Sequence, residues 1–242
     1  MAKKRHKLNR EEAIVFNNEG FTGIKDQFIR LKDNILYFAA DGKKVIQVES
    51  SVASEAKTTT VSNLAVCLGS SGKKTVVIDF DFHKARLHRT FEVKNENGLA
   101  EYVAGKVTKE EMIKQTKYEN VSIIPRGGEI SNASIVLTSK KVKDLIEELK
   151  RDFDFILLDC PPVLLVSDYI HISQLSDGIL FNVAYGVTKK RQVSEAISLL
   201  RQNNLNIIGA VYTFYDPKKS NNYSEYNYNY YHYYGYGEKT KK

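Results

Sequence analysis

Tryptophan is absent from this chain of 242 residues, and cysteine, methionine and proline are scarce. The two cysteines, Cys67 and Cys160, form no CxxC pair, which argues against a disulfide framework or a zinc site and predicts a reducing compartment. No apolar run approaches the ~20 residues that a membrane-spanning helix needs. The basic start, Met1–Leu8, has no apolar stretch after its charges, so it is not a secretory signal. We therefore expect a cytoplasmic protein.

The rest of the composition is that of a globular protein with a basic balance. Hydrophobic residues make up 42% of the chain and charged residues 27%, which fits one domain with a real core. The formal net charge of +7 permits contact with DNA or anionic lipid but requires neither.

The segment Ser51–Thr59 is the most informative one. It lies between an apolar strand pattern, Val45–Val48, and a helical pattern, Thr60–Leu68. A strand, a tight loop and Lys-Thr at a helix start are the layout of a phosphate-binding loop, whose N–H groups hold anionic oxygens. In that interpretation Lys57 reaches the β- and γ-phosphates of a nucleotide, and the Thr58 hydroxyl binds Mg²⁺.

This loop departs from the usual pattern G-x-x-x-x-G-K-[ST]. Ser51 stands at the first glycine and Ala56 at the second. A Cβ at Ala56 crowds the phosphates or strains the loop if the φ angle there is positive. On the loop alone, an ordinary strand–loop–helix with an exposed lysine stays open beside nucleotide binding.

Two further apolar segments end in carboxylates. Thr75–Asp81 ends in Asp79 and Asp81, and Phe153–Asp159 ends in Asp159. In open α/β sheets the ligand sits at the carboxyl ends of the strands, so these acids and the loop converge on one crevice. Asp159 suits holding a metal-bound water on Mg²⁺, and Asp79 or Asp81 suits accepting a proton from an attacking hydroxyl. Strand-end aspartates that merely cap the next turn are the alternative.

Strand-like apolar runs alternate with helical patterns along the chain. This alternation predicts an α/β fold: a P-loop NTPase-like, mostly parallel sheet with helices on both faces, followed by a flexible tyrosine-rich tail. The predicted domains are a basic segment at 1–20, a P-loop domain at 21–216 and the tail at 217–242. Further helices are predicted over Thr22–Ala39, Gly98–Ala104, Lys109–Gln115, Ser139–Arg151, Asp168–Leu175 and Lys189–Asn203, and further strands over Val121–Pro125, Gly178–Val183 and Ile207–Tyr212.

The segment Asn221–Gly237 contains eight tyrosines and no aliphatic residue. It cannot supply a packed core, so we predict a flexible tail. If all eight were phosphorylated, they would add on the order of −12 to −16 of charge, enough to reverse the net charge. A sticky low-complexity segment or a stacking surface for nucleic acid is the alternative. The eight tyrosines are Tyr223, Tyr226, Tyr228, Tyr230, Tyr231, Tyr233, Tyr234 and Tyr236.

Together these segments resemble the bacterial tyrosine kinases of the capsule and exopolysaccharide family, a P-loop type unrelated to eukaryotic kinases. Ser50–Thr59 is similar to that family's Walker A motif, Val76–His88 to its Walker A′ motif and Phe155–Leu164 to its Walker B motif. Gly98–Gly105 resembles its G-L-x-x-Y-L-x-G segment, and the tyrosine cluster completes the pattern. The resemblance covers nearly the whole chain.

The resemblance implies a kinase that uses ATP and Mg²⁺ to phosphorylate protein tyrosines, including its own tail in trans within a ring, and that regulates polysaccharide synthesis and export. It implies a membrane-embedded activator of the polysaccharide co-polymerase type at the inner face of the membrane, and no nucleic acid. The implied residues are Lys57, Asp79, Asp81 and Asp159 for catalysis, Thr58, Asp81 and Asp159 for the metal, and Ser51, Ser54, Glu55, Ala56, Lys57, Thr58, Thr59 and Thr213 for the nucleotide; the eight tail tyrosines are the implied phosphate acceptors.

Some positions depart from the family pattern. Its E-x-x-R-x-x-R oligomerisation motif is present only as Asp26, Ile29 and Lys32, with Arg30 displaced by one position. Residues that are usually proline, glycine, arginine or asparagine in the family are replaced here at Ala53, Ala56, His83, Ala85, Ala184 and Thr213.

Two other functions stay open. A partitioning or cell-division-positioning ATPase has the same fold, but it carries a second signature lysine where this chain has Val52, and it lacks a tyrosine tail. A non-catalytic scaffold of the polysaccharide machinery would oligomerise without binding ATP. Because Lys57, Thr58 and the three strand-end aspartates are intact, we favour an active kinase.

Overall fold

The structure is a computed structural model of the chain, and it describes residues 14–16 and 22–215. The eight predicted phosphate-acceptor tyrosines lie outside the described residues, as do the predicted tail 217–242 and most of the predicted basic segment 1–20. The predicted domain boundaries therefore stay predictions. No helix in the described ranges is both long and apolar enough to cross a membrane.

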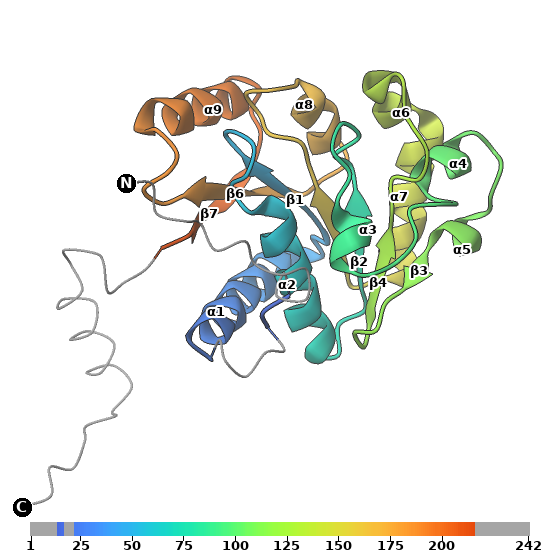
Figure 1. Cartoon of the computed structure of the whole chain (residues 1–242), viewed down its shortest axis with the longest axis horizontal. Helices are drawn as coiled ribbons and strands as arrows, with labels where there is room; N and C mark the ends of the chain where they lie inside the picture. Colours follow the sequence, from blue (N-terminus) through green and yellow to red (C-terminus); the bar gives the residue numbers. More distant parts are fainter. Residues whose placement is uncertain (1–13, 17–21, 216–242) are drawn as a thin grey trace, which may run out of the picture.

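A seven-stranded sheet forms the centre of the protein, in the order β3-β4-β2-β5-β1-β6-β7 (Figure 1). All neighbouring strands are parallel except β3 and β4. The prediction of a mostly parallel α/β sheet is confirmed. The strands are β1 (Val45–Ser50), β2 (Thr75–Asp79), β3 (Lys114–Gln115), β4 (Val121–Ile124), β5 (Phe155–Asp159), β6 (Gly178–Ala184) and β7 (Ile207–Thr213).

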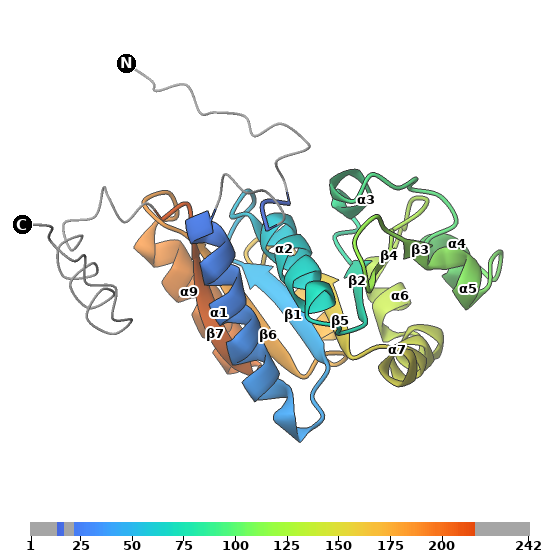
Figure 2. The same cartoon turned by 90° about the horizontal axis from the view of Figure 1, so that it is seen from below.

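Helices cover both faces of this sheet, as Figures 1 and 2 show for α1 and α2 on one face and α7 on the other. Side chains alternate along a strand, so Val77 of β2 packs in the core under α1 and α2, while Val76 and Ile78 pack under α7. The helices are α1 (Thr22–Phe38), η3 (Ala39–Asp41), α2 (Lys57–Ser70), α3 (Leu87–Thr90), α4 (Leu99–Val103), α5 (Lys109–Met112), α6 (Ala133–Thr138), α7 (Lys140–Asp152), α8 (Asp168–Ser173) and α9 (Lys190–Gln202).

Helix α7 shows how local sequence produces an element of this fold. The Ser139 hydroxyl caps its start by accepting the N–H of Val142 at 3.3 Å. Its buried residues recur at helical spacing and pack against the sheet, whereas the intervening positions are largely polar. The buried residues are Val142, Leu145, Ile146 and Leu149.

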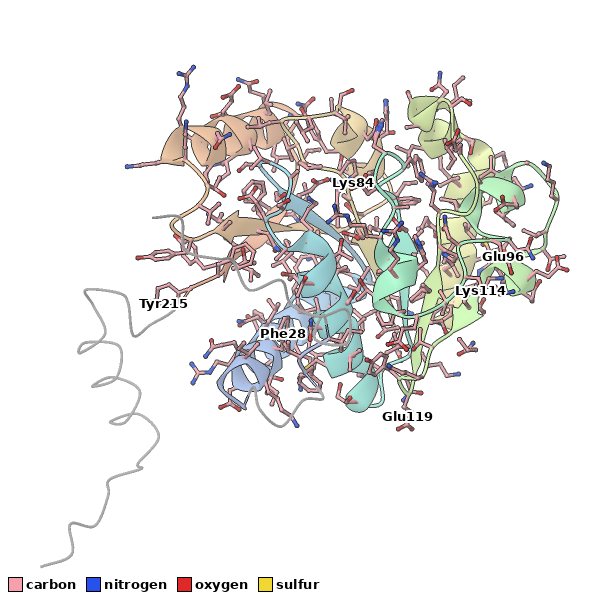
Figure 3. The ribbon with its side chains drawn as sticks, in the orientation of Figure 1. Phe28, Lys84, Glu96, Lys114, Glu119 and Tyr215 are labelled. Atoms are coloured by element: carbon pink, nitrogen blue, oxygen red, sulfur yellow. The ribbon has the colours of Figure 1, made fainter. Side chains whose placement is uncertain are left out.

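The predicted helix Lys109–Gln115 is wrong at its C-terminal end. Helix α5 stops at Met112, and Ile113 has an extended backbone. Lys114 and Gln115 instead form β3, which pairs antiparallel with β4. Pairing with the exposed edge of the sheet outweighs the helical preference of Lys114 and Gln115, since tertiary context routinely overrides propensity. Strands β3 and β7 are the two edges of the sheet, and Figure 3 shows Lys114 of β3 and Tyr215, just beyond β7, at opposite ends of the molecule. The short helices α3 and α6 were not predicted.

The segment Ile14–Phe16 packs against α2, although it belongs to the basic segment predicted to lie outside the domain. Ile14 and Phe16 are buried in the core cluster beneath α1 and α2. The N–H groups of Val15 and Phe16 both donate to Oδ1 of Asn63, at 2.8 and 2.9 Å. Because Nδ2 of Asn63 donates to the Thr59 carbonyl at 2.8 Å, this segment is linked to the first turn of α2.

Candidate nucleotide-binding site

The predicted loop Ser51–Thr59 is shorter in the structure, because α2 begins at Lys57. Residues 51–56 connect β1 to α2 near the centre of the sheet (Figure 1). Its backbone is left-handed at Ser54 and Ala56, with φ angles of 67° and 62°. Ala56 is the N-cap residue of α2 and provides no side-chain acceptor for the first N–H groups of the helix. Uncapped N–H groups at a helix start carry partial positive charge and are suited to binding an anion.

Lys57 begins α2 and is folded back over the loop. The residue is only 8% exposed, and its Nζ donates to Oγ of Ser50 at 3.0 Å. The Ser50 hydroxyl in turn donates to the Val52 carbonyl at 2.9 Å. These contacts contradict the alternative in which Lys57 is an exposed surface lysine, because a buried ammonium beside the loop is available to an anion held there.

Two of the predicted aspartates come together at the carboxyl ends of β2 and β5. Asp79 and Asp159 are direct partners in the register of the two parallel strands, and both are buried. The Thr58 hydroxyl donates to Oδ2 of Asp159 at 2.7 Å. The sheet therefore places the start of α2 directly against the end of β5, although the two residues are 101 positions apart.

Asp79 and Asp81 also serve as caps, which is the alternative that the sequence left open. Oδ2 of Asp79 accepts the N–H groups of Arg86 and Leu87, both at 3.1 Å, at the start of α3. Oδ1 of Asp81 accepts the N–H of Lys84 at 2.8 Å, and Figure 3 shows Lys84 near the carboxyl ends of the central strands. Capping uses one oxygen of each carboxylate, so it does not exclude a second role.

Burial raises the pKa of both facing carboxyls. For Asp79 the main cause is loss of water, and the nearby Asp159 adds to it. For Asp159 burial raises the pKa to about 6, against the opposing effects of the Thr58 hydrogen bond and the positive charge of Lys57. Oδ1 of Asp79 and Oδ1 of Asp159 are buried with no hydrogen-bond partner among the described residues.

The unpartnered oxygens of Asp79 and Asp159 bear on whether the residues at this site could bind a Mg²⁺ ion. Buried polar atoms without partners are rare in native proteins, and a bound ion is one explanation. Mg²⁺ prefers hard oxygen ligands and keeps several waters. The Thr58 hydroxyl, the free oxygen of Asp159 and the nearby Asp81 offer that chemistry, so the donor set fits the ion.

Two residues predicted to bind nucleotide have contacts that the sequence did not reveal. Glu55 is buried, and its carboxylate accepts the N–H groups of Val52 and Ala184 and the hydroxyl of Thr188. The Thr213 hydroxyl donates to the Glu55 carbonyl at 3.2 Å, so the end of β7 reaches the loop. The Glu55 side chain is thus engaged within the protein.

Asn182 of β6 is a site residue that the sequence analysis missed. Its Nδ2 donates to Oγ1 of Thr60 at 2.8 Å and to the Glu55 carbonyl at 3.2 Å, although the residue is fully buried. A signal for it was present, because Asn182 is the one polar side chain in the otherwise apolar strand Gly178–Ala184. Such a residue in a buried strand needs a hydrogen-bond partner from elsewhere in the fold.

Comparisons with known proteins identify the family of this chain. A family model described as an AAA domain matches residues 43–208. The tyrosine-protein kinase YwqD of Bacillus subtilis (strain 168) is 29% identical over 202 residues, which covers 83% of this chain and 84% of the relative. The tyrosine-protein kinase CpsD of Streptococcus pneumoniae serotype 4 is 32% identical over 182 residues, covering 75% of this chain and 80% of the relative.

Two solved structures share the fold of this chain. The kinase domain of the Escherichia coli tyrosine kinase ETK superposes with a TM-score of 0.77 at 26% identity, covering 88% of this chain and 84% of that one. The cell division ATPase MinD of Pyrococcus furiosus superposes with a TM-score of 0.62 at 27% identity, covering 74% of each chain. The fold and the loop thus define a P-loop protein of the AAA-domain class. Within that class, this chain belongs to the bacterial tyrosine-protein kinases.

Proposed function

We propose that this chain binds ATP and Mg²⁺ at the loop 51–56 and transfers the terminal phosphoryl group to tyrosines of its own C-terminal segment. The contact between Thr58 and Asp159 carries this proposal, because it sets a hydroxyl and a buried carboxylate with a free oxygen beside the Lys57 ammonium. The same combination of lysine, hydroxyl and strand-end carboxylate serves nucleotide and metal in P-loop NTPases.

The positive groups of the site stabilise charge on the transferred phosphoryl group. Lys57 and the N–H groups at the start of α2 bind the phosphate oxygens, and they are already in place before the ligand arrives. Thr58, Asp81 and Asp159 would hold the Mg²⁺ ion, which would neutralise phosphate charge. Ser51, Ser54 and Ala56 contact the nucleotide mainly through the loop backbone, and Thr59 contacts it from the first turn of α2. Thr213 lies at the side of the base.

The acceptor tyrosine needs a group that takes its proton, because the pKa of free tyrosine is near 10. Asp79 is fully buried and has one oxygen occupied by the start of α3. Asp81 lies two residues further along and is partly exposed. We therefore assign the orienting and proton-accepting role to Asp81, and to Asp79 the role of holding α3 beside the site.

The acceptors and partners in this proposal rest on the resemblance. The eight tail tyrosines accept phosphate in trans within a ring, and each phosphate adds roughly −1.5 to −2 of charge that repels neighbouring tails. The activator is a membrane-embedded protein of the polysaccharide co-polymerase type, which recruits the kinase to the inner face of the membrane. Regulation of capsular or extracellular polysaccharide synthesis and export follows from that partnership.

Mixing two variants tests the reaction and its direction. One variant carries Lys57→Met with all tail tyrosines intact, and the other has an intact site with its eight tail tyrosines replaced by phenylalanine. We expect neither variant to gain phosphotyrosine alone with ATP and Mg²⁺, whereas in the mixture phosphate appears on the tail of the Lys57→Met chain. Mass spectrometry identifies the acceptors, with and without the cytoplasmic fragment of an activator.

Phosphate on serine alone, or phosphorylation unchanged by Lys57→Met, contradicts the kinase assignment. Wild-type phosphorylation without any transfer in the mixture contradicts reaction in trans. ATP hydrolysis stimulated by DNA, without phosphotyrosine, would instead favour the partitioning ATPase.

A further inference from the structure

Glu55 belongs to the phosphate loop 51–56 and yet is only 1% exposed. One carboxylate oxygen accepts the N–H of Val52 at 2.7 Å, which closes the loop on itself. The other oxygen accepts the N–H of Ala184 at 3.2 Å and the hydroxyl of Thr188. Three donors therefore converge on one buried carboxylate. One of them, Ala184, is the last residue of β6, and another, Thr188, lies in the segment that connects β6 to α9.

The backbone of Glu55 is held from the same side. Its carbonyl accepts Nδ2 of Asn182 in β6 and the hydroxyl of Thr213 in β7, both at 3.2 Å. Every one of these partners except Val52 lies more than a hundred positions away along the chain. The hydrogen bonds of Glu55 thus connect the loop to β6 and β7, the two strands at one edge of the sheet.

The conformation that Glu55 holds is one that the loop does not favour by itself. The residues on either side, Ser54 and Ala56, have left-handed backbones with φ angles of 67° and 62°. Residues that carry a Cβ avoid this region, and they persist there only where surrounding contacts determine the backbone. In this loop the surrounding contacts include the five hydrogen bonds that Glu55 accepts.

We propose that Glu55 is a positioning residue for ATP binding: its carboxylate holds the phosphate loop in the binding conformation before the nucleotide arrives, and it does not contact the nucleotide. This inference rests on the proposed function of the loop. It also reassigns a residue that the sequence alone suggested as a nucleotide contact. Preorganisation lowers the cost of binding, so losing it weakens ATP affinity more than it slows the chemical step.

Two substitutions separate geometry from charge. Glu55→Asp keeps the negative charge but shortens the side chain, so it cannot reach Val52 and Ala184 together. Glu55→Gln keeps the length but replaces one acceptor oxygen with an NH₂ group that meets an N–H donor. A simple repulsion between Glu55 and the phosphates would make Glu55→Gln bind ATP more tightly. The positioning role makes both variants bind it more weakly.

We expect each variant to raise the KM for ATP about tenfold, with kcat within about threefold of wild type, since a hydrogen bond to a charged group corresponds to a change of that order. Calorimetric titration with ATP should show the same loss. Thr188→Val removes one donor at nearly constant volume and should raise KM in the same direction. In the double variant with Glu55→Gln, Thr188→Val should raise KM by a smaller factor than it does alone, because both substitutions disturb the hydrogen bond between Thr188 and Glu55.

Glu101→Gln is the matched control. The Glu101 carboxylate also accepts two N–H groups, from Gly98 at 2.8 Å and Gly128 at 3.0 Å, but in a different part of the fold. We expect this control to lower the melting temperature and leave the KM for ATP unchanged.

The inference is overturned if Glu55→Asp and Glu55→Gln behave like the control, or if they lower kcat and leave KM unchanged. Glu55→Gln that binds ATP more tightly also overturns it. Unaltered ATP binding by Lys57→Met would contradict the proposed function itself, which is a separate outcome.

Discussion

Replacing Ala56 with glycine measures the strain in the phosphate loop. Ala56 has φ of 62° and ψ of 29°, a left-handed conformation that costs a residue with a Cβ about 1–2 kcal/mol. Glycine adopts it freely, but its greater freedom in the unfolded chain costs about 0.4–1 kcal/mol. The difference predicts that Ala56→Gly stabilises the nucleotide-free protein by about 1 kcal/mol, or about 2–4 °C in melting temperature.

The assay is thermal and urea unfolding of the nucleotide-free protein, with Ala104→Gly as the control. Ala104 is exposed at the end of α4 and has an ordinary φ of −70°, so glycine there relieves no strain. We expect the control to lose about 0.4–1 kcal/mol of stability, because glycine has more freedom than alanine in the unfolded chain. The reasoning is refuted if Ala56→Gly destabilises the protein as much as Ala104→Gly does.

Two further predictions concern residues close to the loop. Burial raises the pKa of Glu49 to about 8, so between pH 4.5 and 8 the folded protein holds a proton that the unfolded chain releases, and its stability falls as pH rises. Glu49→Gln should reduce that fall and melt above wild type at pH 8.5, with little difference at pH 4.5; parallel pH profiles for the two proteins would contradict this. Asn63→Ala removes the acceptor of two buried N–H groups, from Val15 and Phe16, and should cost about 2–4 kcal/mol. Urea unfolding measures that cost, and hydrogen exchange at residues 15 and 16 should become faster. A loss of unfolding free energy below about 0.5 kcal/mol would show that Asn63 does not hold the segment Ile14–Phe16 in place.

The chemistry of the site could be predicted because it depends on local order along the chain. An apolar strand followed at once by a polar residue places that residue at the carboxyl edge of a parallel sheet. Asp79 and Asp159 end such strands, and Lys57 and Thr58 follow one after the loop 51–56. The structure brings Thr58, Asp79 and Asp159 together. Helix α7 was predictable for the same reason, since its buried positions recur at helical spacing.

What each site side chain contacts was decided by tertiary structure. The sequence predicted that Glu55 contacts the nucleotide. In the structure its carboxylate instead accepts hydrogen bonds from Ala184 and Thr188, more than a hundred positions away. No period or spacing along the chain encodes such a pair. The same holds for Ile14–Phe16 against Asn63, because a hydrogen bond between distant residues exists only once folding has brought them together. The sequence by itself determined which residues lie at the carboxyl ends of the parallel strands. Folding determined which of them face the proposed ligand and which hold the phosphate loop in place.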